Sequence, residues 1–191
     1  KPVVVVSAVT KITEALIKLA KECAEGKGDE ILDTIIQTHY GVLDQLRVDK
    51  KLLDEDIKEL KNLVNNTKSN KNLDDATLDY FQSFGERMSS KIVAEELKKI
   101  SINAQAFNSW ELGFLTNSDF GNAEPLEISY LNLNKNIKKL RVVPVITGFI
   151  GKNEDGEITT LGRGGSDYTA AVIGAAIKAD EIQIWTDVDG V

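Results

Sequence analysis

The residues that could most clearly do chemistry lie in one glycine-rich run, TLGRGGSDYTA. In this run Arg163 and the pair Gly164 and Gly165 precede Ser166 and Asp167. Glycines let the backbone approach a ligand closely, and the free N–H groups at the start of the helix expected to follow favour an anion. The arginine could hold a carboxylate or phosphate through two parallel hydrogen bonds. The run therefore predicts an anion site; the alternative is a simple turn in which Ser166 caps the helix and Asp167 complements its dipole.

Two further places carry acidic side chains that could bind a ligand. Glu86 stands in the run FGERMSS, within an expected helix and beside its apolar stripe, and a half-buried glutamate is uncommon without a partner. It could accept a ligand ammonium, or it could simply pair with Arg87 or be solvated. Asp187 and Asp189, just after Thr186 at the end of an expected strand, could hold Mg²⁺ or bind nucleotide hydroxyls, although Asp-Gly is also turn chemistry.

Composition excludes several other functions. The formal net charge of −7 argues against a nucleic-acid-binding surface. With a single histidine and a single cysteine, a zinc site and an intrachain disulfide are both excluded. We expect His39 to be a surface or partly buried structural residue and Cys23 to be a small core residue, and cysteine usage favours a reducing, cytoplasmic compartment. The sequence contains no P-loop motif, no apolar run of membrane-spanning length and no visible signal peptide.

Alternating strands and helices must position these residues. Apolar β-branched runs and helical periodicity predict one α/β domain with a parallel sheet. The expected strands are residues 3–6, 103–107, 142–147 and 181–185, with a hairpin turn at 153–156. The expected helices are residues 12–25, 29–47, 51–64 and 74–99, one that ends at 134–140, and 167–178, with 65–72 as a polar connector. The first, third and fourth of these strands are expected to be buried.

The loops after the best strands should meet at one edge of that sheet. These loops are Ser7–Thr13, Thr147–Gly151 and Thr186–Asp189, and the carboxyl ends of parallel strands are the usual place for a ligand. The loop Arg163–Asp167 should lie nearby, because it follows the hairpin. A binding site assembled from these loops and Glu86 is therefore expected.

Five segments in this order resemble aspartokinase, over essentially the whole chain. They are VVSA ending at Ala8, FGERMS around Glu86, VITGFIG around Phe149, TLGRGGSDY around Arg163 and WTDVDG ending at Gly190. The resemblance implies the amino-acid kinase fold, a three-layer αβα sandwich with a mainly parallel sheet, incomplete at both ends, in which residues of about 29–75 form a helical subregion of a single domain over 1–191.

The resemblance also implies transfer of the γ-phosphoryl group of MgATP to the side-chain carboxylate of L-aspartate, giving 4-phospho-L-aspartate. Mg²⁺ would arrive with ATP rather than on a metal site of the chain. Positioning and charge neutralisation would supply most of the acceleration. The resemblance implies that Arg163 and Asp167 are the catalytic residues: Arg163 would hold the α-carboxylate together with Gly164, Gly165 and Ser166, and Asp167 would orient the family's catalytic lysine. It also implies that Glu86 binds the ammonium and that Thr13 and Phe149 line the aspartate pocket. Ser7 would contact the phosphates, and Thr186 and Asp187 would contact the nucleotide.

Departures from the family pattern limit what the chain alone can do. The family's Lys-Phe-Gly-Gly-Thr-Ser motif, the nucleotide-binding segment beyond Val191 and the regulatory ACT domains are absent from the sequence, and Lys1 does not stand at the motif's lysine. We therefore expect a fragment of a homo-oligomeric enzyme, and an isolated chain without kinase activity. Two alternatives stay open: a catalytically inactive aspartate-binding or assembly module, and an amino-acid kinase with another acceptor.

Overall fold

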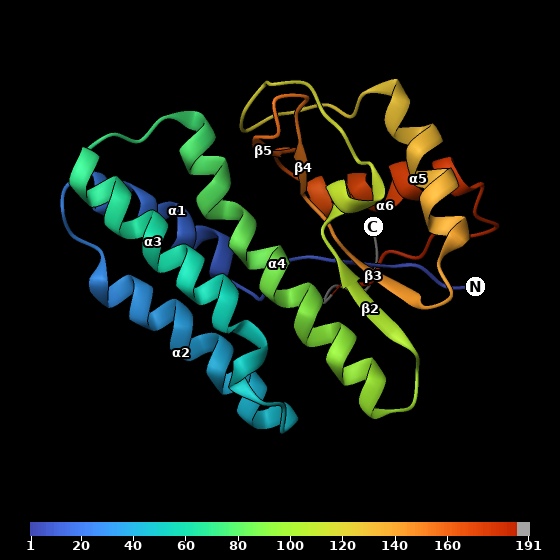
Figure 1. The fold of residues 1–191 in the computed structure, drawn as a ribbon, viewed down its shortest axis with the longest axis horizontal. Helices are drawn as coiled ribbons and strands as arrows, with labels where there is room; N and C mark the ends of the chain where they lie inside the picture. Colours follow the sequence, from blue (N-terminus) through green and yellow to red (C-terminus); the bar gives the residue numbers. More distant parts are fainter. Residues whose placement is uncertain (187–191) are drawn as a thin grey trace.

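A small parallel sheet forms the middle of the molecule in the computed structural model, which describes residues 1–186 (Figure 1). Its strands are β1 (Val4–Val6), β3 (Val143–Thr147) and β2 (Ala104–Phe107), in the order β1-β3-β2. Both pairings are parallel, with Val5 opposite Ile146 and Ala106 opposite Val145. The predicted α/β class and the first three predicted strands are confirmed.

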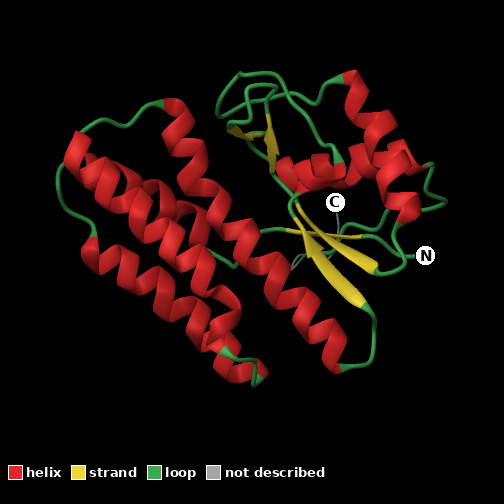
Figure 2. Cartoon of the chain, in the orientation of Figure 1, coloured by secondary structure: helices red, strands yellow, loops and turns green. Residues whose placement is uncertain are grey.

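Helices cover both faces of this sheet. On one face α4 (Asp75–Lys99) packs through Ala94 on Val145. On the other face α5 (Glu127–Lys139) and α6 (Gly165–Ile177) pack around Ile146. Neighbouring residues of one strand thus face opposite layers, as strand geometry requires. The three-layer arrangement is confirmed (Figure 2).

The remaining helices form a lobe against the first half of α4, which we call the helical lobe (Figure 1). It consists of α1 (Ile12–Ala24), α2 (Asp29–Leu46), the short 3-10 helix η1 (Lys50–Leu53) and α3 (Asp54–Asn70). The polar connector expected at 65–72 is wrong over most of its length, because α3 continues to Asn70. Val64 and Thr67 are buried and prolong the apolar stripe of α3 by a further turn.

His39 differs from the expectation of a surface or partly buried residue, because it is fully buried in the helical lobe. It lies one turn from both Ile35 and Leu43, on the face of α2 that packs inward. Its Nδ1 lies 2.8 Å from the Ile35 carbonyl oxygen, and burial lowers its pKa. Cys23 is buried in the same core, as predicted.

A hairpin connects the sheet to the glycine-rich run. β4 (Ile150–Lys152) pairs antiparallel with β5 (Ile158–Thr160) around the predicted turn, where Gly156 has a φ of 83°. The short 3-10 helix η2 (Ser109–Leu112) packs beside β4, where the Ser109 hydroxyl donates to the Ile150 carbonyl. The hairpin brings the chain from the end of β3 back to the same edge of the sheet.

Two sequence predictions about strands need correction. Residues 181–185 form no strand, and Ile182, Ile184 and Trp185 are 46%, 51% and 89% exposed. Their alternating pattern supplies strand propensity, but a strand also needs the hydrogen bonds of a neighbour, and none of the sheet pairings within residues 1–186 includes them. Similarly, Val4–Val6 are half-buried rather than buried, because β1 is an edge strand of the described sheet.

Candidate functional site

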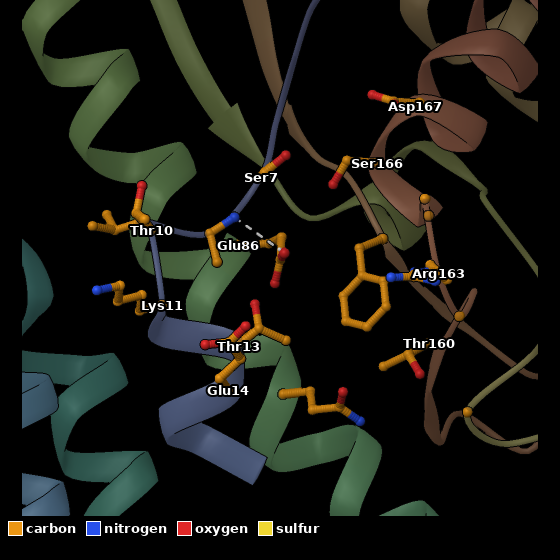
Figure 3. Close-up of a pocket in the computed structure, with 18 residues that line it drawn as sticks. Ser7, Thr10, Lys11, Thr13, Glu14, Glu86, Thr160, Arg163, Ser166 and Asp167 are labelled. Atoms are coloured by element: carbon orange, nitrogen blue, oxygen red, sulfur yellow. Dashed lines mark hydrogen bonds between the residues drawn. The ribbon is translucent and has the colours of Figure 1, made fainter. Parts of the chain in front are cut away.

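A pocket of about 550 Å³ lies where the loop after β1, the middle of α4 and the start of α6 meet (Figure 3). Most of the residues predicted for the site line it: Ser7, Thr13, Glu86, Phe149, Arg163, Gly164, Gly165, Ser166 and Asp167. They come from segments as distant in sequence as the first loop and the glycine-rich run. The structure thus brings the predicted loops of β1 and β3 together with the glycine-rich run. The third loop is not among them: Thr186 lines neither this pocket nor the neighbouring cavity, and Asp187 lies outside the described residues.

Glu86 presents a buried carboxylate to this pocket. Its Oε1 accepts the backbone N–H of Ala8 at 3.1 Å, whereas its buried Oε2 has no hydrogen-bond partner within residues 1–186. Only 2% of Glu86 is exposed, and burial raises its pKa to about 8. A buried carboxylate oxygen without a partner is costly, so a ligand ammonium placed there would relieve that cost.

Gly85 makes this arrangement possible. A Cβ atom at Gly85 would lie 2.6 Å from the Cβ of Ala8, closer than real side chains approach. The absence of a side chain lets the loop after β1 touch α4, and this contact puts the Ala8 N–H within reach of Glu86. The glycine and the glutamate of the FGER run therefore act together.

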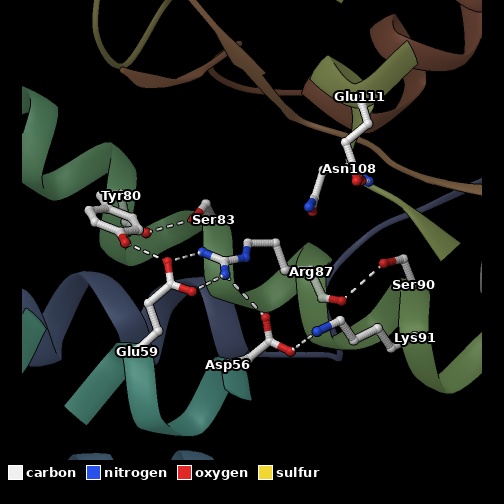
Figure 4. A network of polar contacts seen from close by, with 9 residues as sticks. All are labelled: Asp56, Glu59, Tyr80, Ser83, Arg87, Ser90, Lys91, Asn108 and Glu111. Carbon is white, nitrogen blue, oxygen red and sulfur yellow. Dashed lines mark hydrogen bonds and ion pairs between the residues drawn. The ribbon is translucent and has the colours of Figure 1, made fainter. Parts of the chain in front are cut away.

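Arg87 does not pair with Glu86, so the alternative in which Glu86 forms an ion pair with Arg87 is wrong. Its guanidinium turns toward α3, where it donates to Glu59 at 3.0 and 2.5 Å and lies 3.2 Å from Asp56 (Figure 4). Tyr80 donates to Glu59 and Lys91 to Asp56, so the cluster joins α3 to α4. The arginine next to the site thus stabilises the scaffold rather than neutralising Glu86.

The glycine-rich run forms the opposite wall and starts α6. Gly164, with a φ of 73°, is the residue before the helix, and no side chain within the described range caps its N-terminus. Ser166 is inside the first turn, so the alternative in which it caps the helix is wrong. The free N–H groups of this turn and the exposed guanidinium of Arg163 border the same pocket. Such a turn is suited to an anion.

Phe149 fixes the approach of α6 to the end of β3. It has a φ of 63°, unusual for a residue with a side chain, and its N–H donates to the Thr169 hydroxyl at 3.0 Å. A Cβ atom on Gly165 would lie 2.7 Å from the Phe149 ring. Gly148 is equally constrained, because its Cβ atom would meet the Ser166 hydroxyl at 2.7 Å. The glycines of both motifs are therefore needed for close packing around the pocket.

Several residues of the pocket wall had no predicted role: Thr10 and Lys11 within the expected loop Ser7–Thr13, Thr160 at the start of the glycine-rich run, and Glu14, Gln82 and Gly121 outside every predicted site segment. Lys11 directly precedes α1 with a φ of 67°, and its position in the hydroxyl-rich loop after β1 was a usable signal. Gly121 belongs to a loop that carried no motif, and only the tertiary structure places it here.

A second, larger cavity of about 960 Å³ adjoins the first. Ser7, Ser166 and Asp167 line both, so the two cavities meet at these side chains. The larger one extends along β1 and α6 to residues 178–185. The arrangement offers room for two ligands that would touch at this junction.

Residues 1–186 contain no grouping of three or more His, Cys, Asp or Glu side chains placed to hold a metal ion. Within the same range no helix has both the length and the apolar character needed to cross a bilayer.

The fold is an α/β sandwich with a ligand pocket at the carboxyl ends of its parallel strands. The family model that describes the amino acid kinase family matches residues 1–191 of the chain. The chain belongs to this family. Its similar relatives are aspartokinases: it is 38% identical over 200 residues to aspartokinase 1, chloroplastic, of Arabidopsis thaliana, covering all of the chain and 35% of that protein. It is 37% identical to lysine-sensitive aspartokinase 3 of Escherichia coli, covering 98% of the chain and 42% of that protein.

Solved structures give the same relationship. Escherichia coli aspartokinase III in complex with aspartate and ADP superposes with a TM-score of 0.84 at 33% identity, over 99% of this chain and 43% of that one. The same enzyme in complex with lysine and aspartate gives 0.86. The aspartate kinase of Clostridium acetobutylicum gives 0.79 at 25% identity. The chain therefore spans between 35% and 43% of the length of these relatives.

Proposed function

We propose that the protein containing this chain is an aspartate kinase, which transfers the γ-phosphoryl group of MgATP to the β-carboxylate of L-aspartate and forms 4-phospho-L-aspartate. The chain supplies the amino-acid half of the active site. Support comes from the aspartokinase relatives over the whole chain and from the chemistry of the pocket. A place at the first step of lysine, threonine and methionine biosynthesis is part of the same proposal.

One observation carries the assignment of the acceptor. Within residues 1–186, one buried carboxylate oxygen of Glu86 has no hydrogen-bond partner and no side chain caps the start of α6. Glu86 lines the same pocket in which Arg163 and the start of α6 favour an anion. A ligand with one ammonium and one carboxylate satisfies both walls at once. Free α-amino acids have this pair of groups, whereas an N-acylated amino acid would leave Glu86 facing a neutral amide.

The other residues receive roles that fit their places. Thr13 and Phe149 line the amino-acid pocket, and the backbone of Gly164 and Gly165 helps Arg163 with the α-carboxylate. Ser7 and Ser166 lie where the two cavities meet, which suits hydroxyls that donate to the transferring phosphoryl group or the carboxylate beside it. Asp167 at the same junction would orient a lysine supplied by the family's first-strand motif.

The nucleotide fits the second cavity, which the hydroxyls of Ser7 and Ser166 border. ATP would bring the phosphoryl group, and Mg²⁺ would come with it. We assign Thr186 and Asp187 to nucleotide contacts on the resemblance alone. A homo-oligomeric state and a cytoplasmic location, the latter resting on the low cysteine content, belong to the proposal as well.

The test is acceptor specificity of the purified full-length protein. Acyl phosphate is trapped as a hydroxamate in the presence of MgATP and L-aspartate, L-glutamate or N-acetyl-L-glutamate. The proposal expects ATP-dependent hydroxamate with L-aspartate above both glutamate compounds. Preference for either glutamate compound would reassign the acceptor. Calorimetric binding of L-aspartate without any hydroxamate would instead support an inactive binding module.

A further inference from the structure

Asp79 is a buried carboxylate that no part of the proposed chemistry uses. It lies on α4, seven residues before Glu86, and is 1% exposed. Seven residues are close to two helical turns, so both carboxylates lie on one face of the same helix. The helix thus carries Asp79 and Glu86 as one rigid unit.

Asp79 accepts hydrogen bonds from two segments of the opposite pocket wall, at Thr160 and at Gly121. Its Oδ2 accepts the backbone N–H groups of Thr160 at 2.8 Å and Gly121 at 2.9 Å. Its Oδ1 accepts the Thr160 hydroxyl at 2.9 Å and the Gln82 amide at 3.3 Å. Burial raises the pKa of Asp79, while the donors of Gly121 and Thr160 act in the opposite direction. The carboxylate therefore ties α4 to the end of β5 and to the loop that contains Gly121.

Both contacts of Asp79 are close to Arg163. Thr160 ends β5, three residues before the arginine. Gly121 lies against Gly162, where a Cβ atom would be 3.1 Å from the Gly121 carbonyl oxygen, so the residue before Arg163 is held from the other side as well. Figure 3 shows Glu86 and Arg163 on two sides of the pocket. The hydrogen bonds of Asp79 connect the helix that carries Glu86 to the segment that carries Arg163.

We propose that Asp79 is a positioning residue that sets the separation between Glu86 and Arg163, and so makes the pocket selective for ligands that carry both an ammonium and a carboxylate. The inference rests on the proposed function. A ligand that binds only through carboxylates does not depend on this separation, because it does not engage Glu86. Asp79 itself touches no substrate.

The test compares L-aspartate with succinate, which has both carboxylates of aspartate but no ammonium. In the full-length protein, the KM of L-aspartate, the inhibition constant of succinate and the KM of MgATP are measured for the wild type and for Asp79→Ala. We expect the KM of L-aspartate to rise about tenfold or more, the loss expected for a misplaced charged hydrogen bond, with the other two constants within about threefold. The preference for aspartate over succinate therefore falls.

Two further variants make the result decisive. Asp79→Asn should give an intermediate loss, because its amide oxygen still accepts both backbone N–H groups while its nitrogen faces the Gln82 amide. Tyr80→Phe, the next residue of α4, removes a hydrogen bond to Glu59 away from the pocket and should leave the preference unchanged.

Equal weakening of aspartate and succinate by Asp79→Ala, or no change in either, overturns the inference. If Asp79→Ala does not fold, Asp79→Asn is read in the same way, and an unchanged preference there overturns it. Failure of the proposed function shows separately, as a wild-type protein that does not phosphorylate aspartate.

Discussion

The Glu86 carboxylate is anchored by the backbone N–H of Ala8, 78 residues earlier in the chain, at 3.1 Å. This bond joins the middle of α4 to the loop after β1 and uses one of the two carboxylate oxygens. The other oxygen is buried and, among the described residues, has no partner. The fold therefore holds a carboxylate rigidly at the pocket while leaving half of its hydrogen-bonding capacity for a ligand.

Aspartate binding should release protons from Glu86. Burial raises the pKa of this carboxyl to about 8 in the ligand-free protein, so it is largely protonated at neutral pH. A bound ammonium favours the ionised form, and binding below that pKa should release up to about one proton per site. Titration calorimetry at pH of about 7 in buffers of different ionisation enthalpy measures this release. Glu86→Gln should abolish it and raise the KM of aspartate, and an undiminished release in that variant would remove Glu86 from the role.

The KM of L-aspartate should also fall as pH rises. Between the ordinary glutamate pKa of 4.5 and the raised pKa of about 8, the ligand-free site holds a proton that the bound ammonium displaces. Binding therefore improves until pH passes the raised pKa and then levels off. Steady-state kinetics across this range tests the sign, and Glu86→Gln is the matched control because its amide does not titrate. A KM that rises over this range in the wild type would contradict the assignment.

Gly85→Ala and Gly41→Ala should have opposite effects, although both glycines lie inside helices. At Gly85 the added Cβ would lie 2.6 Å from the Cβ of Ala8, whereas at Gly41 on α2 no atom of the described residues would lie within 4 Å of it. Gly41→Ala should stabilise by up to about 1 kcal/mol through helix propensity alone. Gly85→Ala should push the loop away from Glu86, lower the thermal midpoint and raise the KM of aspartate. Equal midpoints for the two variants would contradict this reading.

Arg87→Met should destabilise the protein strongly. It would leave Asp56, which is 1% exposed, with Lys91 as its remaining charged contact in the cluster of Figure 4. Removal of one member of a buried ion pair costs about 3 kcal/mol or more. Lys98→Met is the control on the same helix, because it removes an exposed pair with Glu95 and should cost less than about 1 kcal/mol. Denaturant unfolding of both variants distinguishes the two, and comparable losses would show that the cluster contributes little.

The sequence predicts the site better than it predicts the contacts that support it. The glycine-rich run and the FGER run carry local signals. Glycines mark positions where the backbone can take a positive φ or approach another segment closely, and Glu86 is a charged residue beside the apolar stripe of an expected helix. Asp79 carried no such signal, because its partners Gly121 and Thr160 lie 42 and 81 residues away and are defined only by the folded chain. A buried polar group is recognised by what surrounds it, which a single sequence does not show.

The errors in the fold prediction have similar causes. His39 lies one turn from Ile35 and Leu43, so its position on the buried face of α2 could be predicted from the sequence. The charged residues of that segment instead favoured the prediction of a surface position. The connector at 65–72 has turn-forming residues, and the burial of Val64 and Thr67 outweighs them. Residues 181–185 have the pattern of a strand, yet strand formation depends on a neighbour that local propensity cannot supply.

Arg163 should determine the affinity for the acceptor rather than the rate of transfer. Its guanidinium borders the pocket beside the uncapped start of α6, where an α-carboxylate would receive charge-assisted hydrogen bonds. Arg163→Ala in the full-length protein should raise the KM of L-aspartate by about a hundredfold, the value of a strong bidentate pair, and leave the KM of MgATP within about threefold. Arg163→Lys keeps the charge but not the planar fork, so its KM for L-aspartate should lie between those of the wild type and Arg163→Ala.

Since the arginine would contact the α-carboxylate and not the carboxylate that is phosphorylated, kcat should fall much less than kcat/KM. An unchanged KM for aspartate would remove Arg163 from this role, and a loss confined to kcat would place it at the phosphoryl group instead.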